Sequence, residues 1–84
     1  MATSGLIPLK QLWKMLESCA PGYQKEAREH NWLVTWNDRS YPTLPRGPHG
    51  KRENPGIERG HIRQLIRQLE VPQDCAKKHL PQLR

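Results

Sequence analysis

The sequence predicts a small α+β domain in which a three-stranded antiparallel sheet carries two helices on one face. Apolar residues recur every three or four positions near both ends of the chain, as in amphipathic helices. Between them lies a stretch rich in tryptophan and β-branched residues, which favours strands. Because 84 residues bury only a modest core, we expect a single domain over 1–84. Its core should span about 8–71, with a frayed N-terminus and a short C-terminal tail.

The first helix is expected between Pro8 and the Pro21-Gly22 pair. Proline suits a first helical turn, where its missing N–H would have no partner, and Pro-Gly ends a helix. The residues that share one face of this helix are Leu9, Leu12, Trp13, Leu16 and Cys19.

Three strands are expected to follow. A weak candidate covers Tyr23–Ala27, and the strongest signal covers Asn31–Trp36, where large apolar residues alternate along the chain. The turn-forming run Asn37-Asp38-Arg39-Ser40 leads into a returning strand at Tyr41–Leu44. Pro42 predicts that this strand is interrupted or lies at the edge of the sheet, because proline lacks an N–H for the ladder.

A proline- and glycine-rich loop, Pro45–Gly56, precedes the second helix. The apolar stripe of that helix is Ile62, Leu65, Ile66 and Leu69, with Val71 at its end and Pro72 closing it. Asp74–Leu80 is expected to add one short helical turn. The resulting α-β-β-β-α order is dsRBD-like, which means that it is the layout of double-stranded-RNA-binding domains. Layout alone does not fix function.

The formal charge of +6 predicts a polyanionic partner. Nucleic acid is the first candidate, and an acidic protein or a membrane surface are the alternatives. With no apolar run long enough for a membrane span or a secretory leader, we expect a cytoplasmic protein. In that compartment Cys19 and Cys75 should be reduced.

His30, at the entrance to the strongest strand, is the candidate catalytic residue. RNA cleavage needs a group that takes or gives a proton near neutral pH, and imidazole does both. The alternative is a surface histidine without a role. His49 is a second acid–base or phosphate-binding candidate, whereas His61 and His79 receive no role. Because neither H-x₃-H nor C-x₂-C spacing occurs, we expect no metal site and no cofactor.

Arginines recur every four residues along the second helix and predict a basic surface that neutralises phosphates. The predicted RNA-binding residues are Arg46, His49, Lys51, Arg52, Arg59, Arg63 and Arg67. The helical stripe is alternatively a solvated face, or a surface for an acidic partner. Trp32, Trp36 and Tyr41 are expected in the core, with stacking on unpaired bases as the alternative.

Four stretches of the chain follow one another in the order of a known family and together cover positions 8–71. They are Lys10–Glu17 against a K-E-L-I-K-L-L-E pattern, Arg28–Asn31 against G-S-H-H, Thr43–Pro45 with Pro48–Gly50 against V-P-x-H, and Gly60–Arg67 against G-T-L-R-x-I-L-K. On these motifs the chain resembles the HicA-type mRNA interferase toxins. It departs from the pattern at Arg28-Glu29, where the family has Gly-Ser, and in a longer loop at 46–56.

The resemblance implies a toxin of a toxin–antitoxin pair. It would be a metal-independent endoribonuclease that cleaves mRNA, with His30 as the acid/base and a HicB-like antitoxin protein as its partner. The alternative function is a non-catalytic RNA-binding or protein-interaction domain of the same fold, for which the changed context of His30 would reflect lost activity.

Overall fold

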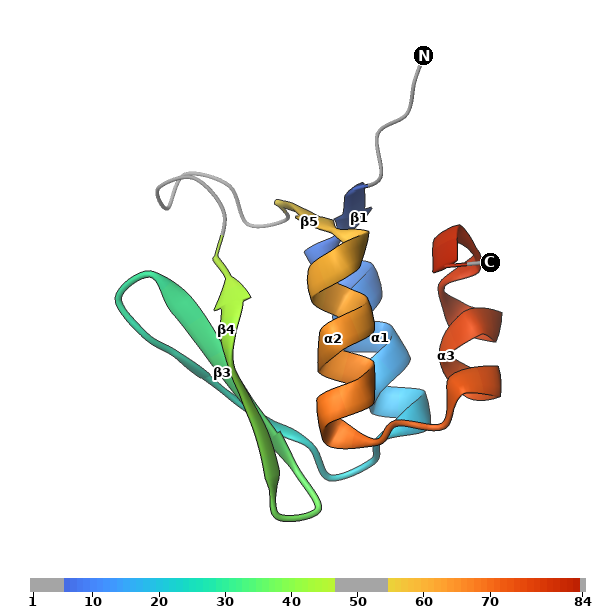
Figure 1. Ribbon diagram of the computed structural model, residues 1–84, viewed down its shortest axis with the longest axis horizontal. Coiled ribbons are helices and arrows are strands. Elements are labelled where there is room, and N and C mark those ends of the chain that lie inside the picture. Colours follow the sequence, from blue (N-terminus) through green and yellow to red (C-terminus); the bar gives the residue numbers. More distant parts are fainter. Residues whose placement is uncertain (1–5, 47–54, 84) are drawn as a thin grey trace.

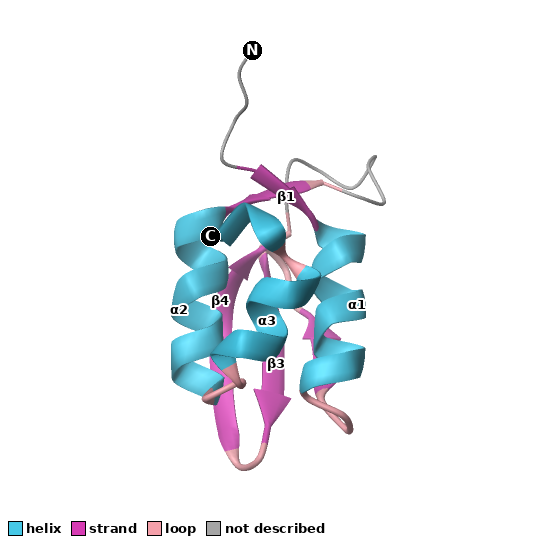
Figure 2. Cartoon of the chain, turned by 90° about the vertical axis from the view of Figure 1, so that its right-hand side faces the viewer, coloured by secondary structure: helices cyan, strands magenta, loops and turns pink. Residues whose placement is uncertain are grey.

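Figure 1 shows the computed structural model, which describes residues 6–46 and 55–83. Its elements are β1 (Leu6–Pro8), α1 (Leu9–Cys19), β2 (Gln24–Ala27), β3 (Asn31–Trp36), β4 (Arg39–Pro45), β5 (Gly56–Glu58), α2 (Arg59–Leu69), α3 (Gln73–His79) and the 3₁₀ turn η1 (Pro81–Leu83). The predicted fold class is confirmed, because β2, β3 and β4, which follow α1 and precede α2 in the chain, form an antiparallel sheet. Figure 2 shows the helices on one side of this sheet.

α1 begins directly after Pro8, as its fixed backbone angle favours. Its buried residues are Leu9, Leu12, Met15, Leu16 and Cys19, which agree with the predicted face except that Met15 takes the place given to Trp13. Trp13 is half-buried and packs against the margin of the core. There its ring meets Trp32 of β3 edge-on, with the ring centroids 5.2 Å apart.

The β3–β4 hairpin closes through a two-residue loop, Asn37-Asp38, in which both residues have positive φ, 56° and 65°. Asparagine and aspartate accept this left-handed backbone, and it matches the twist of the flanking strands. The pairing shifts register between Trp32 and Val34, opposite the stretch of β4 that contains Pro42. β4 lies at the edge of the sheet, as that proline predicted.

α2 buries the whole predicted stripe of Ile62, Leu65, Ile66 and Leu69 in the common core, where the helix packs on β4. It ends at Glu70, whose left-handed conformation brings its N–H to the carbonyls of the last turn. Val71 is then buried, also as predicted. None of the helices within 6–46 and 55–83 is long and apolar enough to cross a membrane.

A second sheet, formed by β1 and β5 alone, was not predicted. Ile7 and Ile57 face each other in this pair and are both buried, so it covers the end of the core where the two helices begin. Gly56 permits the close approach of the strands, because a Cβ there would lie 3.0 Å from the Cβ of Leu6.

The C-terminal segment is part of the core, which therefore extends past the limit of residue 71 that we expected. Ala76, Leu80 and Leu83 are buried, and α3 lies on the outer side of the α1–α2 pair (Figure 2). A disulfide joins Cys19, the last residue of α1, to Cys75 of α3. The prediction of reduced cysteines was wrong, because the packing of α3 against α1 brings together two residues that are 56 positions apart.

Candidate active site

His30 lies in the bend between β2 and β3. The N–H of Arg28 donates to the carbonyl of Asn31 at 2.7 Å, which closes the bend. The side chain of His30 is 78% exposed, and its Nε2 lies 3.7 Å from the Glu29 carboxylate. This contact becomes an ion pair when the imidazole is protonated. The ring is therefore open to a molecule that arrives from solvent, as a reaction on a polymer requires.

Arg46, at the end of β4, is the predicted RNA-binding residue that the structure brings to His30. Its backbone N–H donates to the carbonyl of His30 at 3.4 Å, and its Nη1 donates to the carbonyl of Arg28 at 2.6 Å. The guanidinium carbon also lies 5.8 Å from the centre of a Trp32 ring. These contacts hold a positive charge beside the bend, although the side chain remains exposed.

Lys25 is a further cation near the bend that the sequence did not single out. Its Nζ lies 4.1 Å from the centre of a Trp13 ring and 5.9 Å from that of Trp32, within the range of cation–π attraction. The placement of Lys25 follows from the alternation of side chains along β2, because neighbouring residues of a strand point to opposite faces of the sheet. Lys25 is paired with Val34 in the register, so both side chains lie on the helix-facing side of the sheet.

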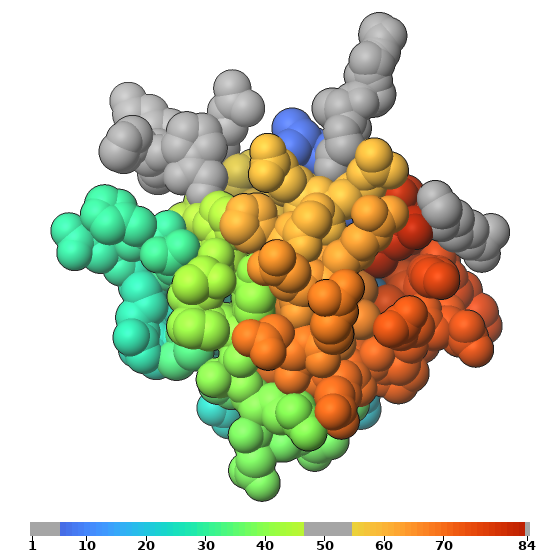
Figure 3. Space-filling model, in the orientation of Figure 1, coloured from blue at the N-terminus to red at the C-terminus, as the bar shows by residue number. Residues whose placement is uncertain are grey.

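The arginine stripe of α2 lies elsewhere on the molecule. Arg59 and Arg63 donate to the carbonyls of Gln82 and Leu83 at 3.1 and 3.4 Å, which turns the stripe toward the C-terminal segment. A pocket between α2 and α3 is lined by Arg63, Ile66, Arg67, Gln73, Ala76, Lys77 and Leu83. In Figures 1 and 3 the bend near residue 30 and α3 lie at opposite margins of the molecule.

The stripe and His30 are thus not gathered into one site. The remaining predicted site residues, His49, Lys51 and Arg52, lie outside the described residues.

Two more histidines have defined surroundings. Nδ1 of His61 lies 3.4 Å from the hydroxyl of Tyr41, which is buried and also donates to Gln64 at 3.1 Å. His79 lies beside the disulfide, where it forms the group of possible metal ligands in the described chain together with Cys19 and Cys75. In the sequence only Cys75 and His79 are close together, in a C-x₃-H spacing, and the fold brings Cys19 to them.

Comparison with known proteins leaves the family open. No family model matches the chain, and neither a curated protein nor a solved structure matches it. The site itself offers an exposed imidazole on a bend whose Arg28 carbonyl accepts from the guanidinium of Arg46, with the Trp32 ring near that guanidinium.

Proposed function

We propose that the chain is a HicA-like toxin, a metal-independent endoribonuclease that cleaves mRNA with His30 as its acid/base. The observation that carries this proposal is the exposed imidazole of His30 on a bend that also holds the guanidinium of Arg46, through the carbonyl of Arg28. The α-β-β-β-α order supports it, since this is the fold that the resemblance to HicA toxins implies.

In the proposed reaction His30 removes the proton from a ribose 2′-hydroxyl, and the oxygen attacks the adjacent phosphorus. The bond from phosphorus to the 5′-oxygen breaks, that oxygen takes up a proton from water, and the protonated His30 returns its proton to solvent. The products are a 2′,3′-cyclic phosphate and a free 5′-hydroxyl. Arg46 neutralises the phosphate on which negative charge builds up, a role that suits a guanidinium held by a backbone carbonyl.

The proposed function also implies a compartment and a partner protein. A toxin that cleaves mRNA acts in the cytoplasm, and a HicB-like antitoxin would hold it inactive. The arginine stripe of α2, which faces the C-terminal segment, offers such a partner a positive surface for its acidic residues.

The direct test is RNA cleavage by His30→Ala. We expect a loss of about 10²–10⁴-fold, the usual contribution of a general acid or base. RNA affinity and the far-ultraviolet circular dichroism spectrum should stay close to those of the wild type. His61→Gln is the matched control and should retain cleavage, and EDTA should have no effect on the wild type. Undiminished cleavage by pure His30→Ala would exclude the assignment.

A non-catalytic RNA-binding domain is the second candidate, and one contact favours it. The Glu29 carboxylate beside His30 carries a charge that repels phosphate, and it stands where the family has a small residue. Overexpression separates the two functions, because a toxin arrests growth whereas a domain that only binds RNA has little effect. RNA binding by the wild-type chain without any cyclic-phosphate product would decide for the second candidate.

A further inference from the structure

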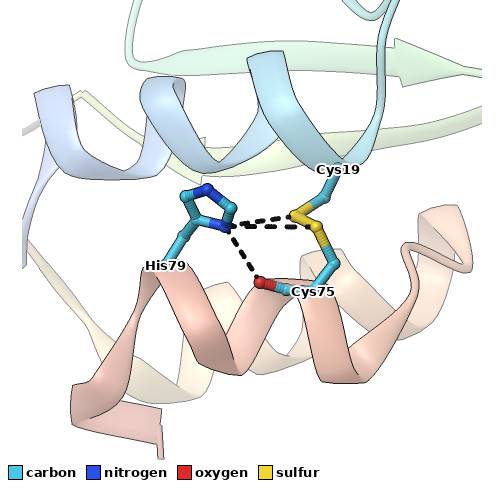
Figure 4. The surroundings of a disulfide bond; sticks show 3 residues. All are labelled: Cys19, Cys75 and His79. Atoms are coloured by element: carbon cyan, nitrogen blue, oxygen red, sulfur yellow. Dashed lines mark hydrogen bonds between the residues drawn. A yellow bond between two sulfur atoms is a disulfide. The ribbon is translucent and has the colours of Figure 1, made fainter.

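Three side chains with metal-binding atoms meet where the end of α1 packs on α3. Nδ1 of His79 lies 3.6 Å from Sγ of Cys19 and 4.0 Å from Sγ of Cys75, and Figure 4 shows the ring facing both sulfurs. All three ligand atoms lie within 4.8 Å of one another. This cluster belongs to neither the His30 bend nor the arginine stripe, so the proposed function makes no use of it.

The backbone fixes the arrangement. Cys75 and His79 are four positions apart on α3, which places them one above the other on the same face of the helix. Cys19 ends α1 opposite that face, and its Cα lies 5.7 Å from the Cα of Cys75. The two helices therefore already bring the three donors together.

α3 is also held on α1 by contacts other than the disulfide. The amide of Gln11 donates to the carbonyl of His79 at 3.1 Å and exchanges hydrogen bonds with the amide of Gln82. Ala76 and Leu80 are buried on the same segment. When the sulfur–sulfur bond opens, these contacts keep the two thiols and the imidazole together.

Two edges of the cluster, those from Nδ1 to the two sulfur atoms, are close to those of a zinc site, whereas the sulfur atoms are bonded to each other and have to separate. With Zn–S near 2.3 Å and Zn–N near 2.0–2.1 Å, the N···S edge of a tetrahedron is about 3.6 Å long. The two N···S distances in the protein, 3.6 and 4.0 Å, already approach this value. Thiolate and imidazole are also the preferred ligands of zinc.

We propose that Cys19, Cys75 and His79 bind one Zn²⁺ ion when the disulfide is reduced. A dithiol reductant gives two electrons and two protons to the disulfide, which yields two thiols and a cyclic disulfide of the reductant. The ion then displaces both thiol protons and is held by two thiolates and Nδ1. In exchange, Nδ1 gives up its 3.1 Å contact with the carbonyl of Cys75. A disulfide oxidant reverses the sequence: it takes two electrons from the two thiolates and becomes two thiolates itself, the Cys19–Cys75 bond forms again, and the ion is released.

Burial leaves one side of the site open. Cys19 is only 5% exposed, whereas Cys75 and His79 are half-buried, so the protein encloses the cluster from the side of α1 and solvent reaches it from the other. A water molecule completes the tetrahedron from that side. The zinc form and the disulfide form exclude each other, because both use the same two sulfur atoms.

The test is titration of the whole chain with Zn²⁺ and with Co²⁺, whose thiolate charge-transfer and visible bands report tetrahedral sulfur ligation. The reduced chain should bind one ion, and the oxidised chain none. The variant His79→Gln should lower the affinity by at least about 100-fold, because losing a direct ligand costs at least as much as losing an outer partner. Cys19→Ser/Cys75→Ser should bind no ion at this site, and His61→Gln, the matched histidine control, should bind like the wild type.

Circular dichroism recorded in the same titration covers the case in which reduction unfolds the chain. Refolding on addition of zinc supports the site, since metal binding then supplies folding free energy. The inference is overturned if the reduced wild type binds no more zinc than the double serine variant, folded or not. It is equally overturned if His79→Gln binds as the wild type does. RNA cleavage enters none of these measurements, so failure here leaves the role of His30 standing, and the reverse also holds.

Discussion

The histidines at the two ends of the molecule have opposite surroundings. His30 is exposed on a bend, with Glu29 3.7 Å away. His79 is half-buried, faces two sulfur atoms and has its carbonyl held by Gln11. An exposed ring suits a reaction with a polymer that comes and goes. A packed ring with fixed neighbours suits a small ligand, which needs donor atoms at set distances.

The two regions also differ in how the chain assembles them. The bend around His30 is built from residues next to it in sequence, and Arg46 is the contact that comes from further away. The cluster around His79 depends on Cys19, 60 positions earlier. A change in the bend should therefore affect RNA cleavage and leave the fold intact. A change around α3 should affect both metal binding and the stability of the fold.

The largest expected effect is on the free energy of unfolding, and it separates a buried residue of the C-terminal segment from an exposed residue of the bend. Leu80→Ala should lower the free energy of unfolding by about 2–5 kcal/mol, because it removes a fully buried side chain and leaves a cavity. Glu29→Ala, at an exposed position, should change it by less than about 0.5 kcal/mol. Urea unfolding of the oxidised chain measures both. Equal effects would mean that α3 is not part of the cooperative core.

A smaller effect separates the two basic regions. If RNA lies across His30, Arg46→Ala should weaken binding by about 10–100-fold, as expected for one charged hydrogen bond, and reduce the salt slope of log K by about 0.7. Arg67→Ala, on the stripe facing α3, should leave both quantities unchanged. Fluorescence anisotropy with a short single-stranded RNA at several salt concentrations measures them. A larger loss of RNA affinity in Arg67→Ala than in Arg46→Ala would show that the RNA binds at the arginine stripe and not across His30.

Most of the fold could be predicted because its signals are local. The stripe Ile62, Leu65, Ile66 and Leu69 has helical spacing, and Asn37-Asp38 supplies the side chains that a tight hairpin turn favours. The β1–β5 pair was missed, because strands of three residues are too short to show a period. α3 appeared only as one helical turn, since its burial depends on α1 and not on its own sequence.

The candidate site was predictable only in part. The chemistry of imidazole together with the resemblance to HicA toxins singled out His30, but the position of Arg46 at the same bend follows from the pairing of β3 with β4, which returns the chain to the bend. The cluster of His79 could not be found in this way. Pairing Cys19 with Cys75 requires the docking of α3, and two distant cysteines in a basic chain favoured the reduced state on compartment grounds.

The smallest effect concerns Tyr23, which lies between the two regions. Its ring stacks on Trp13 of α1, with centroids 6.2 Å apart, at the point where the chain passes from α1 toward β2. Burial raises the pKa of its hydroxyl above the usual 10.0, and the carboxylate of Glu17 raises it further. The folded protein thus keeps this proton to higher pH than the unfolded chain does.

The contribution of Tyr23 to stability is therefore complete below about pH 10 and is lost as the pH rises through the pKa of the folded state. Tyr23→Phe should show a smaller fall in the free energy of unfolding between about pH 8 and about pH 11 than the wild type shows. The difference should be small, because solvent reaches much of the ring and screens its charge. Unfolding by urea at both pH values measures it, and the lysines that titrate in this range are common to both proteins. An identical fall in the two proteins would show that the hydroxyl is as well hydrated in the folded chain as in the unfolded one, and that the junction between α1 and the sheet is open to water.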